Sequence, residues 1–287
     1  EKTGIFQRFI ANKDETSSDM GFLAAKSLFK EYDLTPKKID ALLFVSQTPD
    51  YALPPSSCIL QERLSLNNNI LALDINLGCS GFVNSLALAS SLIKSNTINN
   101  CLIICAETYS KYIKKNDRTN TLIFSDAAST CFVEKDDIYS SIGNFSFGCD
   151  GRGAKELIVE GSGMRGNLDR NKQTLFMNGP AILLFTLDQV PKLLRETLIK
   201  NNLKLKDIDL FIFHQASKLV LDLLRKKIGI EKEKLYSNLE KKGNTVSCSI
   251  PIALKDAFKE KKLIPGSKVL IIGFGVGYSL GSTIITW

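Results

Sequence analysis

The chain has 287 residues, of which 44% are hydrophobic and 23% charged, and its formal net charge is +7. This globular composition fits one large domain or two smaller ones, and no apolar run is long enough to span a bilayer, so we expect no membrane insertion. The positive charge is best explained by lysine-rich helix surfaces. Because no recognised binding motif or basic stripe with aromatic residues occurs, we expect no nucleic acid partner.

The cysteines and the single histidine limit the kinds of site that the chain can hold. There is no CxxC pair, so a zinc site is not expected, and we predict no metal and no bound cofactor. Most of the seven cysteines resemble small buried hydrophobic residues, among them Cys58, Cys101, Cys105 and Cys131. With no export signal at the start, a reducing cytoplasm is the simpler location.

Short apolar strands alternate along the chain with amphipathic helices, which predicts an α/β fold. In the first half, the pattern predicts helices over residues 20–32, 56–66 and 82–94, and strands over residues 41–46, 70–75 and 101–106. In the second half, it predicts helices over residues 180–201, 219–227 and 250–261, and strands over residues 210–213 and 269–272.

An internal similarity indicates that the two halves are related. Residues 34–50 and 203–219 each contain a polar lead-in, an Ile-Asp pair, an apolar strand and a polar turn. Further along each half, residues 78–96 and 243–261 place a glycine turn before a helix. Two matches in the same order predict a duplication, with halves at residues 1–150 and 151–287 that share one body.

Three residues that lie in turns next to predicted strands or helices are candidate catalytic residues. Cys79, in "DINLGCSGF", lies between a strand and a helix start, where the helix dipole should lower its pKa, although a buried structural thiol is the alternative. His214 follows a strand in "FHQAS", where α/β folds bind ligands, although it could be structural. Asn244, in "KGNTVSCSIP", could be a helix cap, but it holds the place in the second half that Cys79 holds in the first.

A glycine-rich segment, "GFGVGYSLGS", follows the last predicted strand. A dinucleotide site is a weak reading, because the chain ends before a βαβ unit could follow. A turn whose backbone N–H groups face a reacting carbonyl fits better.

Together these motifs, with the opening residues 2–21, resemble the β-ketoacyl-acyl-carrier-protein synthase III family of the thiolase superfamily over nearly the whole chain. The resemblance implies a thiolase-like five-layered α-β-α-β-α fold of two duplicated halves, usually a homodimer. It also implies that a segment carrying the family's first strand precedes Glu1. We expect the dimer to form through the strand at residues 101–106.

The resemblance implies an acyltransferase that performs a decarboxylative Claisen condensation. Cys79 would take an acyl group from a coenzyme A thioester, and a malonyl unit on the phosphopantetheine of acyl-carrier protein would lose carbon dioxide to give an enolate. His214 and Asn244 would donate hydrogen bonds to the enolate oxygen. The backbone N–H groups of Cys79 and Val276 would form the oxyanion hole.

Other family positions are matched only in part. Arg118 matches the arginine near the coenzyme's adenine. Lys2 replaces an arginine, so its positive charge can still attract a phosphate but cannot bind it in a bidentate way. Gly179 and Ser217 are expected to bind substrate, with Ser217 replacing an asparagine. Leu219 replaces an arginine of the carrier-docking patch, in which Lys226 and Lys227 remain.

Three other functions stay open at this point. The chain could pass an acyl group from Cys79 to a hydroxyl or amine without decarboxylation, which the changes at Ser217 and Leu219 permit. It could be a thiol hydrolase, or a non-catalytic partner subunit. The motif context disfavours the hydrolase, and the complete Cys–His–Asn set disfavours the partner subunit.

Overall fold

Two mixed β-sheets form the frame of the computed structural model, which describes residues 3–114, 116–136, 141–166 and 173–287. The first sheet has the order β2-β1-β3-β4 and consists of β1 (Ala41–Val45), β2 (Leu71–Ile75), β3 (Asn100–Glu107) and β4 (Ala127–Glu134). The second has the order β5-β11-β10-β8-β9 and consists of β5 (Ser146–Cys149), β8 (Leu210–Phe213), β9 (Leu235–Tyr236), β10 (Lys268–Gly275) and β11 (Ser279–Thr286). A small ribbon pairs β6 (Leu157–Val159) with β7 (Leu175–Met177).

The two sheets share one topology, which confirms the predicted duplication. In the first sheet β1, β2 and β3 are parallel, and β4 runs antiparallel to β3. In the second, β8, β9 and β10 are parallel, and β11 runs antiparallel to β10. Strand β5, at residues 146–149, pairs with β11 and so belongs to the second sheet.

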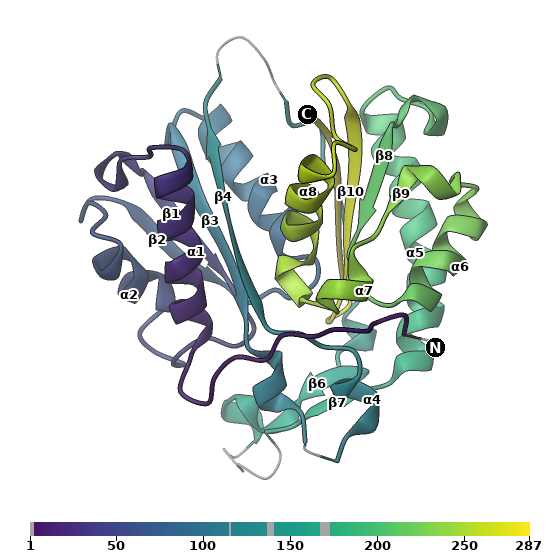
Figure 1. Ribbon diagram of the computed structural model, residues 1–287, viewed down its shortest axis with the longest axis horizontal. Helices are drawn as coiled ribbons and strands as arrows, with labels where there is room; N and C mark the ends of the chain where they lie inside the picture. The colour runs from purple at the N-terminus through teal and green to yellow at the C-terminus, as the bar shows by residue number, and fades with distance from the viewer. Residues whose placement is uncertain (1–2, 115, 137–140, 167–172) are drawn as a thin grey trace.

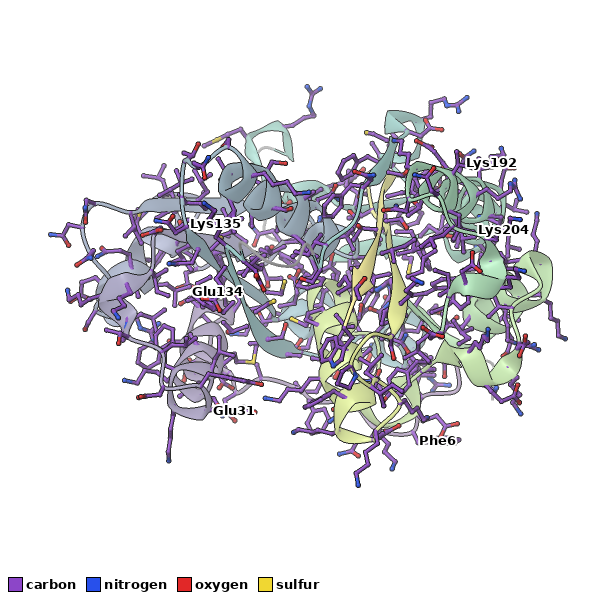
Figure 2. All side chains as sticks on the ribbon, turned by 90° about the horizontal axis from the view of Figure 1, so that it is seen from above. Phe6, Glu31, Glu134, Lys135, Lys192 and Lys204 are labelled. Carbon is purple, nitrogen blue, oxygen red and sulfur yellow. The ribbon has the colours of Figure 1, made fainter. Side chains whose placement is uncertain are left out.

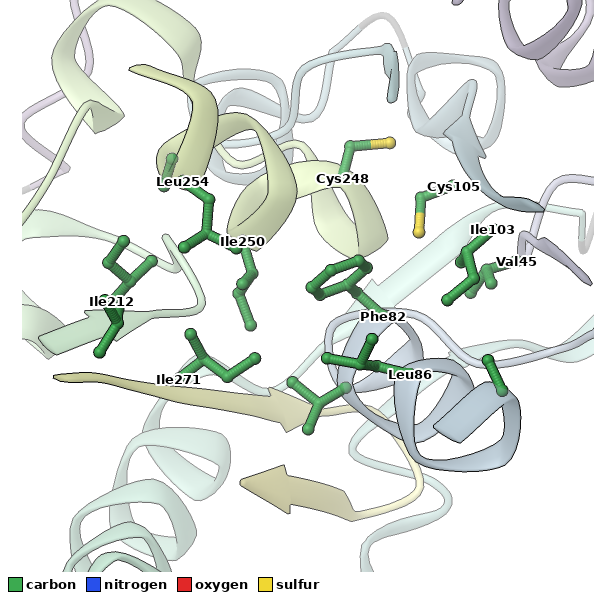
Figure 3. Close-up of a cluster of buried hydrophobic side chains, with 14 of the residues drawn as sticks. Val45, Phe82, Leu86, Ile103, Cys105, Ile212, Cys248, Ile250, Leu254 and Ile271 are labelled. Atoms are coloured by element: carbon green, nitrogen blue, oxygen red, sulfur yellow. The ribbon is translucent and has the colours of Figure 1, made fainter. Parts of the chain in front are cut away.

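Helices cover both sheets and also separate them, which gives the five layers (Figure 1). Helices α1 (Ser17–Glu31) and α2 (Ser56–Arg63) pack with β1 and β3, and α5 (Gly179–Lys200) and α6 (Lys218–Ile228) pack with β8 and β10. Between the sheets lie α3 (Gly81–Lys94) and α8 (Ser249–Lys259), whose apolar faces meet both sheets in one core (Figure 3). Short helices α4 (Arg118–Thr121) and α7 (Leu239–Lys242) complete the fold.

The predicted elements all form, with ends shifted by a few residues. Helix α1 begins at Ser17, three residues before the predicted start, because Thr16 and Asp19 form a capping box. The Thr16 side chain accepts a hydrogen bond from the Asp19 N–H, and the Asp19 carboxylate accepts one from the Thr16 N–H. The pattern does not predict β4, β5, β9 and β11, which extend the two sheets, or the β6–β7 ribbon.

The strand proposed for the dimer edge is in the wrong place. Residues 101–106 belong to β3, which pairs with β1 on one side and β4 on the other, so its backbone groups are already bonded. The apolar run reflects burial on both faces of an internal strand. Strands β2 and β4 form the two edges of this sheet instead, and Leu73 of β2 is 39% exposed.

Most charged side chains lie on the outer surface, where Figure 2 labels Glu31, Lys192 and Lys204. Several form ordinary surface ion pairs: Lys192 pairs with Asp188 within α5, and Lys255 of α8 pairs with Glu31 of α1. This arrangement supports a solvated surface as the main source of the lysine surplus.

Candidate active site

Cys79 lies in the turn between β2 and α3 and is only 7% exposed. The glycines beside it make this turn possible. A side chain at Gly78 would collide with the amide of Gln47, and one at Gly81 would collide with Val45 at 2.5 Å. The sequence therefore folds this turn tightly against the end of β1.

Burial determines the pKa of the Cys79 thiol. Desolvation, with a smaller contribution from the nearby carboxyl of Glu107, raises this pKa to about 12. The prediction that the helix start would lower the pKa is therefore wrong for the substrate-free protein. The thiol must lose its proton during acylation, because little thiolate exists beforehand.

His214 follows β8 and is 2% exposed. Its Nδ1 lies 2.8 Å from the Ser249 hydroxyl at the start of α8, which fixes the ring. Burial lowers the pKa of His214 to about 3, so the imidazole is neutral near pH 7. When Ser249 donates to Nδ1, Nε2 carries the proton and can donate a hydrogen bond.

Asn244 is held by backbone contacts with the other half of the molecule. Its N–H donates to the Ile123 carbonyl at 3.0 Å, and its carbonyl accepts from the Ser125 N–H at 2.9 Å. The side-chain Oδ1 accepts from the Val246 N–H at 3.0 Å, whereas Nδ2 has only a long contact of 3.4 Å with the Ala216 carbonyl. Asn244 thus caps the turn that follows it, and its Nδ2 remains a donor for a bound group.

The three side chains line one hollow of about 510 Å³ whose other walls are mostly apolar. Cys79 comes from the first half, and His214 and Asn244 come from the second, so the turns of both halves meet at one place. Gly179 and Ser217 line the same hollow. Ser217 also caps α6 through the Val220 N–H.

The glycine-rich segment is the hairpin between β10 and β11, and its backbone approaches Cys79 closely. A side chain at Gly275 would lie 3.0 Å from the Cys79 sulfur, and one at Gly273 would lie 2.7 Å from the Cys79 carbonyl oxygen. The glycines are needed for this approach. Val276 follows, and it lines a second hollow of about 200 Å³ that shares Leu157 with the first.

The remaining predicted residues lie farther out. Arg118 is exposed at the start of α4, whose next residue, Thr119, lines the hollow. Lys226 and Lys227 are exposed in the last turn of α6, whose first turn lines the hollow through Leu219 and Val220. Lys2 falls outside the described residues.

Several functional neighbours have no signal in the sequence, namely Gln47, Glu107, Ser247 and Ser249. They are ordinary polar residues brought to the site by tertiary contacts. Within the described ranges, no cluster of metal-binding side chains occurs, and no helix is long and apolar enough to cross a membrane. Cys58, predicted to be buried, is exposed on α2.

Comparisons with known proteins agree with the motifs. Family models of 3-oxoacyl-[acyl-carrier-protein (ACP)] synthase III match residues 73–151, and of its C-terminal part residues 198–287. A β-ketoacyl-[acyl-carrier-protein] synthase III of Caldanaerobacter subterraneus subsp. tengcongensis is 33% identical over 292 residues, spanning 100% of this chain and 88% of the relative. The chain belongs to this family. A homologue of the same name from Clostridium perfringens is 34% identical over 99% of this chain and 88% of its own length.

Solved structures of the family have the same fold. One 3-oxoacyl-(acyl-carrier-protein) synthase III, 36% identical, superposes with a TM-score of 0.96 over 100% of this chain and 89% of its own. Another, from Burkholderia xenovorans, is 35% identical with a TM-score of 0.92 over 99% and 83% of the two chains. The thiolase-like fold is therefore confirmed, and the protein is a synthase III-type enzyme rather than a non-catalytic partner.

Proposed function

We propose that this enzyme condenses an acyl-coenzyme A primer with a malonyl unit on acyl-carrier protein, with loss of carbon dioxide. The observation that carries the proposal is the meeting of Cys79, His214 and Asn244 in one mostly apolar hollow. A thiol suits a covalent acyl intermediate, and two neutral donors suit an enolate that must not be protonated.

In the first half-reaction, the Cys79 sulfur attacks the thioester carbonyl of the primer and expels the coenzyme A thiol. The backbone N–H groups of Cys79 and Val276 donate to the oxyanion. The proton of the buried thiol passes to the imidazole of His214, which accepts it at Nε2 in the tautomer whose Nδ1 donates to Ser249. This proton then protonates the leaving coenzyme A thiolate.

In the second half-reaction, the malonyl group loses carbon dioxide, and its electron pair forms an enolate. His214 has by then exchanged to the tautomer in which Ser249 donates to Nδ1, so its Nε2–H and the Asn244 Nδ2–H both donate to the enolate oxygen. The carbanion attacks the Cys79 thioester and forms the new C–C bond, which expels the Cys79 thiolate. The thiolate then takes a proton from solvent, replacing the proton that left with coenzyme A. The apolar walls exclude water, which strengthens both hydrogen bonds and protects the acyl group from hydrolysis.

The outer residues have substrate-binding roles in this proposal. Arg118 and Lys2 meet the coenzyme's adenine end and phosphates, and Gly179 and Ser217 contact the pantetheine arm. Lys226 and Lys227 attract the acidic carrier protein. All seven cysteines are free thiols, which fits an enzyme of the reducing cytoplasm.

The enzyme is also proposed to be a homodimer, now through β2 rather than β3. Strand β2 leaves one edge without a partner in the described structure, and its Leu73 is 39% exposed. Pairing two β2 edges would satisfy these backbone groups and cover the apolar side chain.

Two measurements on the same sample test the proposed function. We expect intact-protein mass to increase by one acyl group with a suitable acyl-coenzyme A, and carbon dioxide to be released when malonyl-carrier protein is added. Acyl transfer to a hydroxyl or amine acceptor without carbon dioxide release would favour the non-decarboxylating alternative. Release of free acid with neither product would indicate a hydrolase.

A further inference from the structure

Glu107 is a buried carboxyl at the end of β3 that the mechanism above does not use. Its side chain is 0% exposed and forms no ion pair within the described part of the chain. Burial raises the pKa of Glu107 to about 8. A carboxyl without a cationic partner is costly to bury, so its hydrogen bonds must hold it in place.

These hydrogen bonds reach both halves of the molecule. One carboxyl oxygen accepts from the Gln47 N–H at 3.1 Å and the Thr48 hydroxyl at 3.2 Å, in the loop after β1. The other accepts from the Ser247 hydroxyl at 2.9 Å, in the turn before α8. Glu107 therefore joins the half that carries Cys79 to the turn that follows Asn244.

The turn that receives this bond has a strained backbone. Val246 has φ of +54°, a left-handed conformation that β-branched residues rarely adopt. It is also the residue whose N–H donates to Asn244 Oδ1, so the amide turns its Nδ2 the other way, where the contact with the Ala216 carbonyl is a long 3.4 Å. Ser247, the next residue, is fixed by Glu107. Strained residues persist only where surrounding contacts hold them, and the Ser247–Glu107 bond is such a contact.

We propose that Glu107 is a positioning residue that, through Ser247, holds the Val246 turn in the conformation that directs the Asn244 amide toward the enolate. The inference depends on the roles proposed above for Cys79 and Asn244. It assigns Glu107 to the second half-reaction, although Glu107 itself lies in the first half of the chain.

Glu107 also affects the nucleophile, through its charge rather than its hydrogen bonds. The titratable groups that face it are Cys79, Cys105, Tyr109, Tyr112 and Cys248, and none is a cation. An ionised Glu107 therefore disfavours the Cys79 thiolate. Removing the charge should shift the reactivity of Cys79 to lower pH, an effect that a purely structural contact would not have.

The test compares two network variants, Glu107→Ala and Ser247→Ala, with Ser85→Ala as a matched control. Each network variant removes the Glu107–Ser247 bond. A further variant, Glu107→Gln, removes the charge but can keep the bond, because its Oε1 can accept from the Gln47 N–H and its Nε2 can donate to the Ser247 hydroxyl. Ser85 is also fully buried, but its hydroxyl has no partner. Acylation of Cys79 is followed by intact mass, and the second step by carbon dioxide release from pre-acylated enzyme.

We expect both network variants to slow carbon dioxide release at least about tenfold, less than the roughly hundredfold loss from removing a donor itself. Acylation should stay within about twofold or become faster, and Ser85→Ala should change neither step. Glu107→Gln should also shift the pH profile of Cys79 alkylation to lower pH. An unchanged second step in both variants, or an equal decrease in both steps, would overturn the inference. Failure of the wild type to acylate would instead refute the role of Cys79.

Discussion

Two opposing effects act on the thiol of Cys79 at the scale of a single residue. Helix α3 begins two residues later, and a helix N-terminus stabilises a negative charge by about 0.3–1 kcal/mol, less than one pKa unit. Full burial shifts a pKa by up to about 3–5 units. Burial therefore dominates, and the pKa of Cys79 rises to about 12.

This balance predicts slow alkylation of Cys79 at neutral pH. The exposed Cys58 and Cys149 should react with iodoacetamide first, and the Cys79 rate should rise about tenfold per pH unit as the thiolate fraction grows toward a pKa of about 12. Peptide mapping across pH 7–10 measures this, within the range where the protein stays folded. Faster labelling of Cys79 than of Cys58 at pH 7 would show that the thiol is activated before substrate binds.

At the scale of elements, the β10–β11 hairpin is fitted to the nucleophile. A methyl group at Gly275 would lie 2.8 Å from the Cys79 Cβ and 3.0 Å from its sulfur, so one of the two segments must move. We expect Gly275→Ala to reduce acylation on the order of a hundredfold, because reacting groups tolerate little displacement. Gly151→Ala is the matched control, since a Cβ there meets nothing within 4 Å. Equal acylation rates in the two variants would contradict the close approach.

The free edge of β2 is the proposed dimer interface, so a charge placed on it should change the oligomeric state. Leu73→Asp should convert a dimer to monomers, because it places a charge on the proposed pairing edge. Leu23→Asp is the control, since Leu23 is 61% exposed on α1, away from that edge. Sedimentation at micromolar concentration distinguishes the states. A dimer that survives Leu73→Asp would place the interface elsewhere, and a monomeric wild type would exclude the proposed dimer.

The sequence predicts where helices and strands lie along the chain better than it predicts which of them pack or pair together. Runs of apolar residues located β1, β3 and β8, and glycine turns located Cys79 and Asn244, because these signals are local. Strand order is not local, so an internal strand, β3, was mistaken for an edge. The contacts of Glu107 with Ser247, 140 residues away, follow only from the packing of the two halves. The pKa of Cys79 was mispredicted for the same reason, since burial depends on the whole fold.

At the scale of the whole molecule, charge should guide the carrier protein to the site. Lys226 and Lys227 lie on α6 about 10 Å along the helix from Leu219, which lines the hollow. Changing both lysines to glutamate should raise the apparent carrier KM several-fold, most strongly at low salt, and leave acylation by coenzyme A substrates unchanged. The control changes Lys26 and Lys30, exposed on α1, to glutamate. If both double variants raised the carrier KM equally, Lys226 and Lys227 would have no specific role in carrier binding.

The assignment of Cys79 to acyl-enzyme formation and of Asn244 to the condensation is tested most directly by Asn244→Ala. The purified variant is incubated with an acyl-coenzyme A, its mass is measured, and malonyl-carrier protein is then added. We expect normal acyl mass on Cys79 and condensation reduced on the order of a hundredfold or more, because one enolate donor is lost. Cys79→Ala should show the reverse, with no acyl mass but some carbon dioxide release. A folded Asn244→Ala that fails to acylate, or that condenses at the wild-type rate, would show that Asn244 is not a donor to the enolate oxygen.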